Sequence, residues 1–252
     1  MARIFVIPLV FLLFWTFPVS AVDAQPPEIP APGEASKDAP APEDWAGLWY
    51  TSFGFVDLAV DGNAVTGTYS CCNGVLEGTV EGTQIEFSWK DPIYGEGWGY
   101  WYWQDEGLRM RGVFGKMEDR GTGGQWTAVR PPEPRLGEDA VRFAVRAEHP
   151  RHGTFRGEAR LSGLEGDSIE GTLRGAYDLE ARGGAFKYDM WNLLDGRREG
   201  DALVLEWVDP LYKTLGDLRL ELTESGDWAG TWQPHFTEPE EERPEIRFLS
   251  PE

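Results

Sequence analysis

Apolar and polar side chains alternate residue by residue along several short segments of the chain. The apolar faces of four such segments are Ile85, Phe87 and Trp89; Leu203, Leu205 and Trp207; Val141, Phe143 and Val145; and Leu218, Leu220 and Leu222. A period of two with one apolar face predicts antiparallel strands that are packed on one side and solvated on the other. Turn signals such as Asp61-Gly62-Asn63 and Asp195-Gly196 recur at short intervals between the strands. The pattern predicts an all-β fold of antiparallel up-and-down meanders.

One segment of the chain recurs without a gap. Residues Leu76–Tyr94 read LEGTVEGTQIEFSWKDPIY, and residues Leu194–Tyr212 read LDGRREGDALVLEWVDPLY, with identity at eight of nineteen positions. Average composition would give about one or two identities by chance. The repeat predicts two related units, either as two small barrels or as one pseudo-symmetric structure. It also predicts that Trp89 and Trp207 are equivalent, inward-facing residues.

Composition shifts along the chain suggest where the folded units begin and end. Prolines are concentrated in two segments outside the repeats, which favours extended linkers there. We therefore expect a signal peptide at residues 1–24, a disordered spacer at 25–42, a first barrel-like unit at 43–130, a linker at 131–139, a second barrel-like unit at 140–236 and an acidic tail at 237–252. Within that tail, residues 246–248 could add one short edge strand.

The N-terminal segment has the pattern of an export signal. Arg3 precedes an almost unbroken apolar run, and small residues allow cleavage after Ala21 or Ala24. The alternative is a membrane anchor, but the run is shorter than the roughly 20 residues that a spanning helix needs. We expect a secreted or periplasmic protein that is not integral to the membrane after cleavage.

The chain is strongly acidic, with a formal net charge of −20. That charge repels nucleic acid and anionic lipid surfaces, so we expect no nucleic-acid partner. Its simplest role is solubility, and recruitment of cations is the alternative. The 31 glycines and 12 tryptophans further favour short strands and tight turns.

Three motifs in the first unit resemble a known family. Gly47–Tyr50 (GLWY), Gly67–Tyr69 (GTY) and Phe87–Lys90 (FSWK) follow one another as in the first strands of avidin- and streptavidin-type barrels, which belong to the calycin group. The resemblance implies an up-and-down barrel that binds a ligand. It places Tyr69 and Trp89 at positions that contact the ligand in that family.

The chain departs from the family at other ligand positions. Thr51 stands where the family has Asn, and Phe55 stands where it has Ser. The long loop that covers the ligand is reduced to the short segment Ser70–Gly74. These differences argue against biotin as the ligand.

The densest group of aromatic residues is the segment Trp98–Trp103, with Tyr94 just before it. On a strand, Trp98, Tyr100 and Tyr102 face one side, whereas Trp101 and Trp103 face the other. One face can be core, and the other is then exposed, covered or bound to a partner. The alternatives are core packing, a binding platform and, least favoured, a membrane barrel. The candidate ligand-binding residues are Tyr69, Trp89, Tyr94, Trp98, Tyr100, Trp101 and Trp103.

The two cysteines of the chain, Cys71 and Cys72, are adjacent. Export favours oxidation, so we expect a disulfide between them, although adjacent Cα atoms lie about 3.8 Å apart and the ring is strained. Intermolecular bridges and free thiols are the alternatives. Neither these cysteines nor His149 and His152 have the partners of a metal site, so we expect no metal and no cofactor.

No short catalytic motif is present, and the acidic residues have no spacing that selects a catalytic pair. The repeated Asp-Pro-x-Tyr at Asp91–Tyr94 and Asp209–Tyr212 is typical of a turn that ends a strand. A functional rim aspartate is the alternative. The leading hypothesis is a non-enzymatic protein that binds a carbohydrate or small amphipathic molecule in the first unit. The alternatives are a structural envelope or protein-interaction module, and a hydrolase that uses rim carboxylates such as Asp91.

Overall fold

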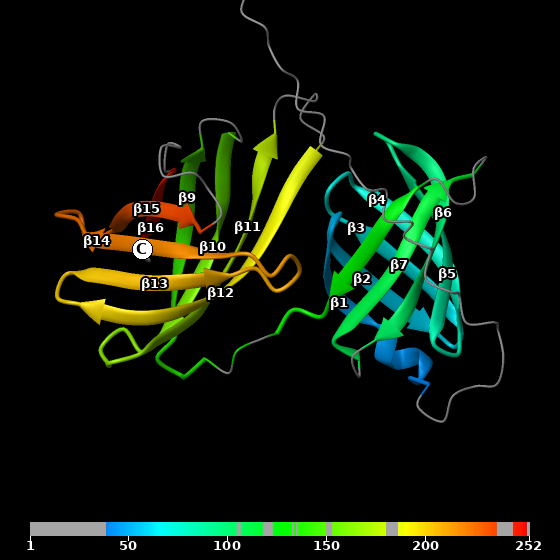
Figure 1. The fold of residues 1–252 in the computed structure, drawn as a ribbon, viewed down its shortest axis with the longest axis horizontal. Helices are drawn as coiled ribbons and strands as arrows, with labels where there is room; N and C mark the ends of the chain where they lie inside the picture. The colour runs from blue at the N-terminus through cyan, green and yellow to red at the C-terminus, as the bar shows by residue number, and fades with distance from the viewer. Residues whose placement is uncertain are drawn as a thin grey trace, which may run out of the picture. The chain divides into compact units, whose positions relative to one another are not determined.

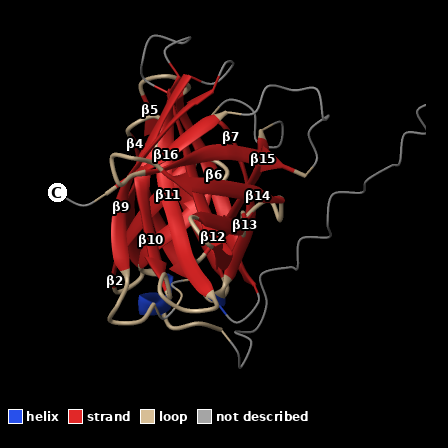
Figure 2. Cartoon of the chain, turned by 90° about the vertical axis from the view of Figure 1, so that its left-hand side faces the viewer, coloured by secondary structure: helices blue, strands red, loops and turns tan. Residues whose placement is uncertain are grey.

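The computed structural model describes residues 39–104, 107–117, 123–132, 134, 136–149, 153–179, 186–235 and 244–250. The predicted signal peptide, most of the spacer, His152 and parts of the predicted linker and tail lie outside these residues. Strands dominate the described chain (Figure 2). Within it, no helix has both the length and the apolar character needed to cross a membrane.

The first eight strands form a closed antiparallel barrel (Figure 1). Its strands are β1 (Gly47–Thr51), β2 (Gly54–Asp61), β3 (Ala64–Tyr69), β4 (Gly74–Glu81), β5 (Gln84–Asp91), β6 (Gly95–Gln104), β7 (Arg109–Lys116) and β8 (Gly124–Val129). Each strand pairs with the next along the chain. The barrel closes between the two ends of the meander, where Tyr50 lies opposite Val129 and Thr51 lies opposite Ala128.

The next eight strands form a second closed barrel of the same connectivity. Its strands are β9 (Val141–His149), β10 (Gly153–Ser162), β11 (Ile169–Leu179), β12 (Phe186–Glu199), β13 (Ala202–Val208), β14 (Leu215–Leu222), β15 (Trp228–Pro234) and β16 (Glu245–Leu249). Strand β16 pairs with both β15 and β9, so it closes the barrel. This barrel therefore extends beyond residue 236, and the segment 246–248 is not an edge strand. Its alternating Ile246 and Phe248 are fully buried, which is why it belongs to the core.

The predicted all-β fold of antiparallel meanders is confirmed, and it consists of two barrels. The two copies of the repeated segment begin on the fourth strand of each barrel and run through the fifth. Trp89 lies opposite Gly97, and Trp207 lies opposite Gly216. Both tryptophans are buried inside their barrels, so they occupy equivalent inward-facing positions, which is consistent with two related units.

The predicted hairpin turn at Asp61-Gly62-Asn63 is present, with Gly62 at a φ of 58°. The turn predicted at Asp195-Gly196 is wrong, because both residues lie within β12. A Cβ at Gly196 would lie 2.1 Å from the carbonyl oxygen of Val204, so this glycine allows close packing between strands. The turn instead uses Gly200, whose φ is 63°.

Tryptophan side chains fill one end of the first barrel. A short 3₁₀ helix, Pro42–Trp45, precedes β1 (Figure 1). It places the ring of Trp45 4.7 Å from the ring of Trp103. Trp49 packs against the same ring at 5.9 Å, and its indole N–H donates to the carbonyl of Trp45. Arg130 lies over the Trp49 ring at 4.3 Å, a cation–π arrangement. This end is packed, whereas the opposite end carries a pocket.

Candidate functional site

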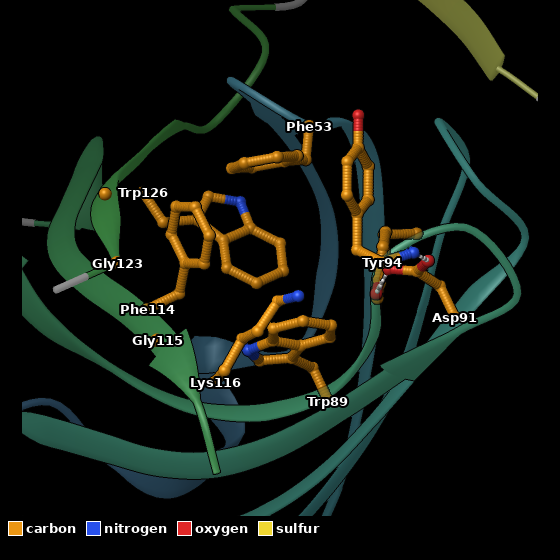
Figure 3. Close-up of a pocket in the computed structure, with 11 residues that line it drawn as sticks. Phe53, Trp89, Asp91, Tyr94, Phe114, Gly115, Lys116, Gly123 and Trp126 are labelled. Carbon is orange, nitrogen blue, oxygen red and sulfur yellow. Dashed lines mark hydrogen bonds between the residues drawn. The ribbon is translucent and has the colours of Figure 1, made fainter. Parts of the chain in front are cut away.

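The pocket at the other end of the first barrel has a volume of about 550 Å³. Six of its residues are aromatic, and the others are glycines or charged residues (Figure 3). The lining residues are Phe53, Tyr69, Trp89, Asp91, Tyr94, Phe114, Gly115, Lys116, Gly123, Gly124 and Trp126. This volume lies in the range of small-molecule sites, which are concave and mostly apolar.

Strand periodicity explains why these side chains meet. The inward-facing residues of β5 are Ile85, Phe87, Trp89 and Asp91, so Trp89 and Asp91 are the two nearest the β5–β6 turn. On β3 the inward series ends in the same way at Tyr69. The pocket thus lies at the end of the barrel where β1, β3, β5 and β7 each turn into the next strand. Phe53 comes from the turn between β1 and β2.

Trp126 forms the floor of the pocket and is held on several sides. Its ring lies 5.1 Å from Phe53, 5.4 Å from Tyr69 and 4.9 Å from Trp101. Its indole N–H donates to the hydroxyl of Thr51 at 3.0 Å. That hydroxyl also accepts from the backbone N–H of Phe53 and donates to the carbonyl of Gly54. The floor and the adjoining turn are therefore fixed by one hydrogen-bond network.

Trp89 forms one wall, and a glycine lets it lie close to the next strand. A Cβ at Gly97 would lie 2.4 Å from Cζ2 of Trp89, so the ring packs directly on the backbone of β6. The indole N–H donates to the carbonyl of Trp98 at 3.1 Å. The wall is therefore rigid, as expected for a pre-formed site.

Asp91 is the one carboxylate among the described lining residues, and both of its oxygens accept hydrogen bonds from the protein. Oδ1 accepts from the backbone N–H groups of Ile93 and Tyr94 at 2.8 and 2.6 Å. Oδ2 accepts from the hydroxyl of Tyr69 at 2.7 Å. Burial, and then this hydrogen bond, raise the pKa of Tyr69 well above its usual value. Tyr69 therefore stays protonated and acts as a fixed donor.

The equivalent aspartate of the second barrel makes the same turn. Oδ1 of Asp209 accepts from the backbone N–H groups of Leu211 and Tyr212 at 2.8 and 3.0 Å. The repeated Asp-Pro-x-Tyr thus closes a turn in both barrels, as the structural interpretation of the sequence predicts. Burial raises the pKa of Asp209.

Other pocket positions differ between the barrels. Leu76 and Leu194 begin the two copies of the repeat, and they pair with Gly67 and Gly171. Tyr69, two residues beyond Gly67, therefore corresponds to Leu173, two residues beyond Gly171. The strand pairings of the two barrels can be compared in the same way for the lining side chains of β7 and β8. Phe114 corresponds to Trp232, Lys116 to Pro234, and Trp126 to Ile246. The ring set of this pocket is therefore particular to the first barrel.

The structure separates the seven candidate ligand-binding residues into three groups. Tyr69, Trp89 and Tyr94 line the pocket. Trp98 and Tyr100 lie half-buried on the outer wall of β6, where their rings are 6.0 Å apart and nearly parallel. The inward pair on the same strand lies in the core, with Trp101 fully buried and Trp103 packed at the closed end. The seven residues therefore do not form one site.

The β3–β4 turn contains the two cysteines. The structure joins the sulfur atoms of Cys71 and Cys72, whose Cα atoms are 3.8 Å apart, in a vicinal disulfide. Both residues are buried in the core of the first barrel. The turn follows Tyr69 directly, so it helps to set the rim of the pocket. No group of metal-ligating side chains occurs among the residues that the structure describes.

Four functional candidates were missed from the sequence: Phe53, Phe114, Lys116 and Trp126. The period-two pattern of β7 puts Met110, Gly112, Phe114 and Lys116 on one face, but the glycine and the lysine weaken the apolar signal. Phe53 lies in a turn, where periodicity says nothing. Only barrel closure brings β8, with Trp126, next to β1.

Comparison of the chain with known protein families, with curated proteins and with solved structures gives no match.

Proposed function

We propose that the protein is a non-enzymatic binding protein whose ligand occupies the pocket of the first barrel. The observation that carries the proposal is the pocket itself: about 550 Å³, lined by six aromatic rings at the mouth of a barrel. Its floor and wall are held by hydrogen bonds from Trp126 and Trp89, so binding requires little ordering of these side chains. The export predicted from the N-terminal sequence, together with a disulfide beside the pocket, supports a role outside the cytoplasm.

The rings favour a ligand with a flat, largely apolar body. Aromatic side chains contribute large contact areas and prefer stacked or edge-to-face partners. A small amphipathic molecule or a sugar ring satisfies this requirement. A hydrolase with two acids is less well supported, because Asp91 is the one carboxylate among the described lining residues and it accepts three hydrogen bonds.

A matched pair of tyrosines tests the proposal. Tyr94 lines the pocket and is 37% exposed, whereas Tyr212 holds the equivalent place in the second barrel and is 46% exposed. Calorimetric titration with the neutral compound 2-naphthamide is expected to show saturable binding. Tyr94→Ala is expected to weaken it on the order of tenfold through the loss of one ring contact, and Tyr212→Ala to leave it unchanged. Equal effects of both substitutions, or no saturable binding, would contradict the proposal.

An interaction module is a second candidate, and the outer wall of β6 favours it. Trp98, Tyr100 and Tyr102 form a half-buried row of rings that faces away from the barrel interior. Aromatic rows of this kind suit sugar faces or a protein surface. A glycan array probed with the wild type and with Tyr100→Ala tests this candidate. Glycan binding that Tyr100→Ala abolishes but Tyr94→Ala leaves unchanged would assign carbohydrate to the outer wall.

A further inference from the structure

Lys116 occupies an inward-facing position at the rim of the pocket. On β7 the inward series is Met110, Gly112 and Phe114, and Lys116 continues it at the last residue of the strand. Figure 3 shows its side chain extending from the rim toward the rings of Trp89 and Trp126. A lysine that lay on the other face of β7 would direct its charge into solvent. Lys116 is exposed at the rim, and its ammonium group faces a pocket whose other lining residues are six aromatic residues, Asp91 and glycines.

No acidic side chain of the described residues pairs with this ammonium group. Asp91 is the acidic residue among the described lining residues of the same pocket, and its oxygens accept from Tyr69, Ile93 and Tyr94. The second barrel forms the same aspartate turn although Pro234 stands at the position equivalent to Lys116, so the turn does not depend on a lysine at that position. Among the described lining residues, Lys116 is thus the charged one whose side chain makes no hydrogen bond or ion pair with a described residue.

The barrel architecture does not require a lysine here. Lys116 pairs with Gly97, and the corresponding residue of the second barrel is Pro234, which pairs with Gly216. Proline has neither a charge nor a side-chain donor. The charge therefore accompanies the aromatic pocket and is absent from the equivalent position of the other barrel.

We propose that the ligand of this pocket is an amphipathic anion, with an apolar or aromatic body among the rings and a carboxylate held by Lys116. The inference rests on the proposed function, because it names the chemistry of the ligand in the same pocket. A hydrogen bond between ionised partners is about twice as strong as a neutral one. The net charge of −20 repels anions at long range, so selectivity for an anion depends on a local cation such as Lys116.

Two compounds that differ only in charge test the proposal. Calorimetric titration compares 2-naphthoate with the neutral 2-naphthamide on the full-length protein. The wild type is expected to bind the carboxylate on the order of tenfold more tightly. Lys116→Met is expected to abolish this preference by weakening the binding of the carboxylate much more than that of the amide, and Lys116→Arg to retain it. The control is Lys90→Met, which removes an exposed lysine from the outward face of β5 and is expected to keep the preference.

The outcomes separate this inference from the proposed function. If both compounds bind equally to the wild type and Tyr94→Ala weakens both, the pocket binds ligands but the proposed anion selectivity is wrong. If 2-naphthylmethylammonium binds more tightly than 2-naphthoate, the proposal is overturned in favour of a cationic ligand. If none of the three compounds shows saturable binding, both the inference and the proposed function fail.

Discussion

At the scale of single residues, Thr51 links the stability of the first barrel to the form of its pocket. Its side chain is 2% exposed, and its hydroxyl makes hydrogen bonds with Trp126, Phe53 and Gly54. The indole of Trp126 depends on this hydroxyl to satisfy its buried N–H. A family resemblance from the sequence points to position 51 as a ligand contact, but its side chain here supports the floor of the pocket from behind.

Thr51→Val is therefore expected to destabilise the protein by about 1–3 kcal/mol, because the buried N–H of Trp126 and the part-buried N–H of Phe53 lose their acceptor while the shape is retained. Urea unfolding measures this change. Thr66→Val is the control, since Thr66 is exposed on β3, and its effect is expected to stay within about 0.5 kcal/mol. A Thr51→Val variant as stable as the control would show that the hydroxyl network contributes nothing.

At the scale of the elements, β6 separates two kinds of aromatic residue by the alternation of a strand. Trp101 is 0% exposed, lies 4.5 Å from Phe87, and donates its indole N–H to the carbonyl of Trp126. Tyr100, the preceding residue, is half-buried on the outer wall. The sequence could assign the two faces, but it could not tell which one was the core.

Trp101→Ala is expected to lower the free energy of unfolding by about 3–5 kcal/mol, as for a buried aromatic residue. Tyr100→Ala is expected to cost about 1 kcal/mol, through the loss of contacts with neighbouring rings. Denaturation midpoints of the two variants give the comparison. Equal, large losses would indicate that something covers the outer wall and that it is not a free binding surface.

The β13–β14 turn gives a prediction for pH. Burial raises the pKa of Asp209, so the folded protein holds this proton at a pH where the unfolded chain has released it. The contribution of this group to stability is therefore greatest below the usual pKa of an aspartate, and it decreases as the pH rises through the raised value. Asp209→Asn keeps an acceptor for the N–H groups of Leu211 and Tyr212 without the charge.

Relative to the wild type, the Asp209→Asn variant is expected to gain stability as the pH is raised from about 4 to about 7. Urea midpoints of both proteins at the two pH values measure this difference. A difference that stays constant, or that changes in the opposite direction, would show that burial does not disfavour the ionised carboxylate.

The β3–β4 turn gives a prediction for the thiols. A bond between Cys71 and Cys72 uses both sulfur atoms of the chain, so no free thiol is expected in the denatured, non-reduced protein. Titration with a thiol reagent before and after reduction measures this, and a non-reducing gel is expected to show a monomer. Free thiols before reduction, or a covalent dimer, would refute the vicinal bond.

At the scale of the whole molecule, periodicity and repetition were sufficient to predict the fold class and its two units. The alternation through Trp89 and Trp207 identified the strands and their buried faces, and the gapless repeat related them. The sequence predicted barrel-like units but not which strands close them, because closure depends on pairing between strands that are far apart in sequence, such as β1 with β8. The same reason accounts for the error at the C-terminal strand, since Ile246 becomes core only when β16 reaches β9.

The candidate site was predictable only in part, because pairing between strands distant in sequence brings some of its residues together. Tyr69, Trp89 and Tyr94 lie on hairpins close together in sequence, and the motifs of the first unit identify them. Lys116 lies on β7 and Trp126 on β8, and the barrel that holds both is closed only when β8 pairs with β1. The aromatic density of Trp98–Trp103 was a poor guide, because density says nothing about which side chains face a cavity.

Indole N–H resonances, followed by NMR during titration with 2-naphthoate, test the central claim most directly. The chain has 12 tryptophans, and single Trp→Phe variants can assign their signals. If the pocket of the first barrel is the binding site, the signals of Trp89 and Trp126 shift during the titration. The signals of Trp207 and Trp232, in the second barrel, stay in place. Shifts confined to the second barrel or to Trp98, or no shift at all, would contradict the account.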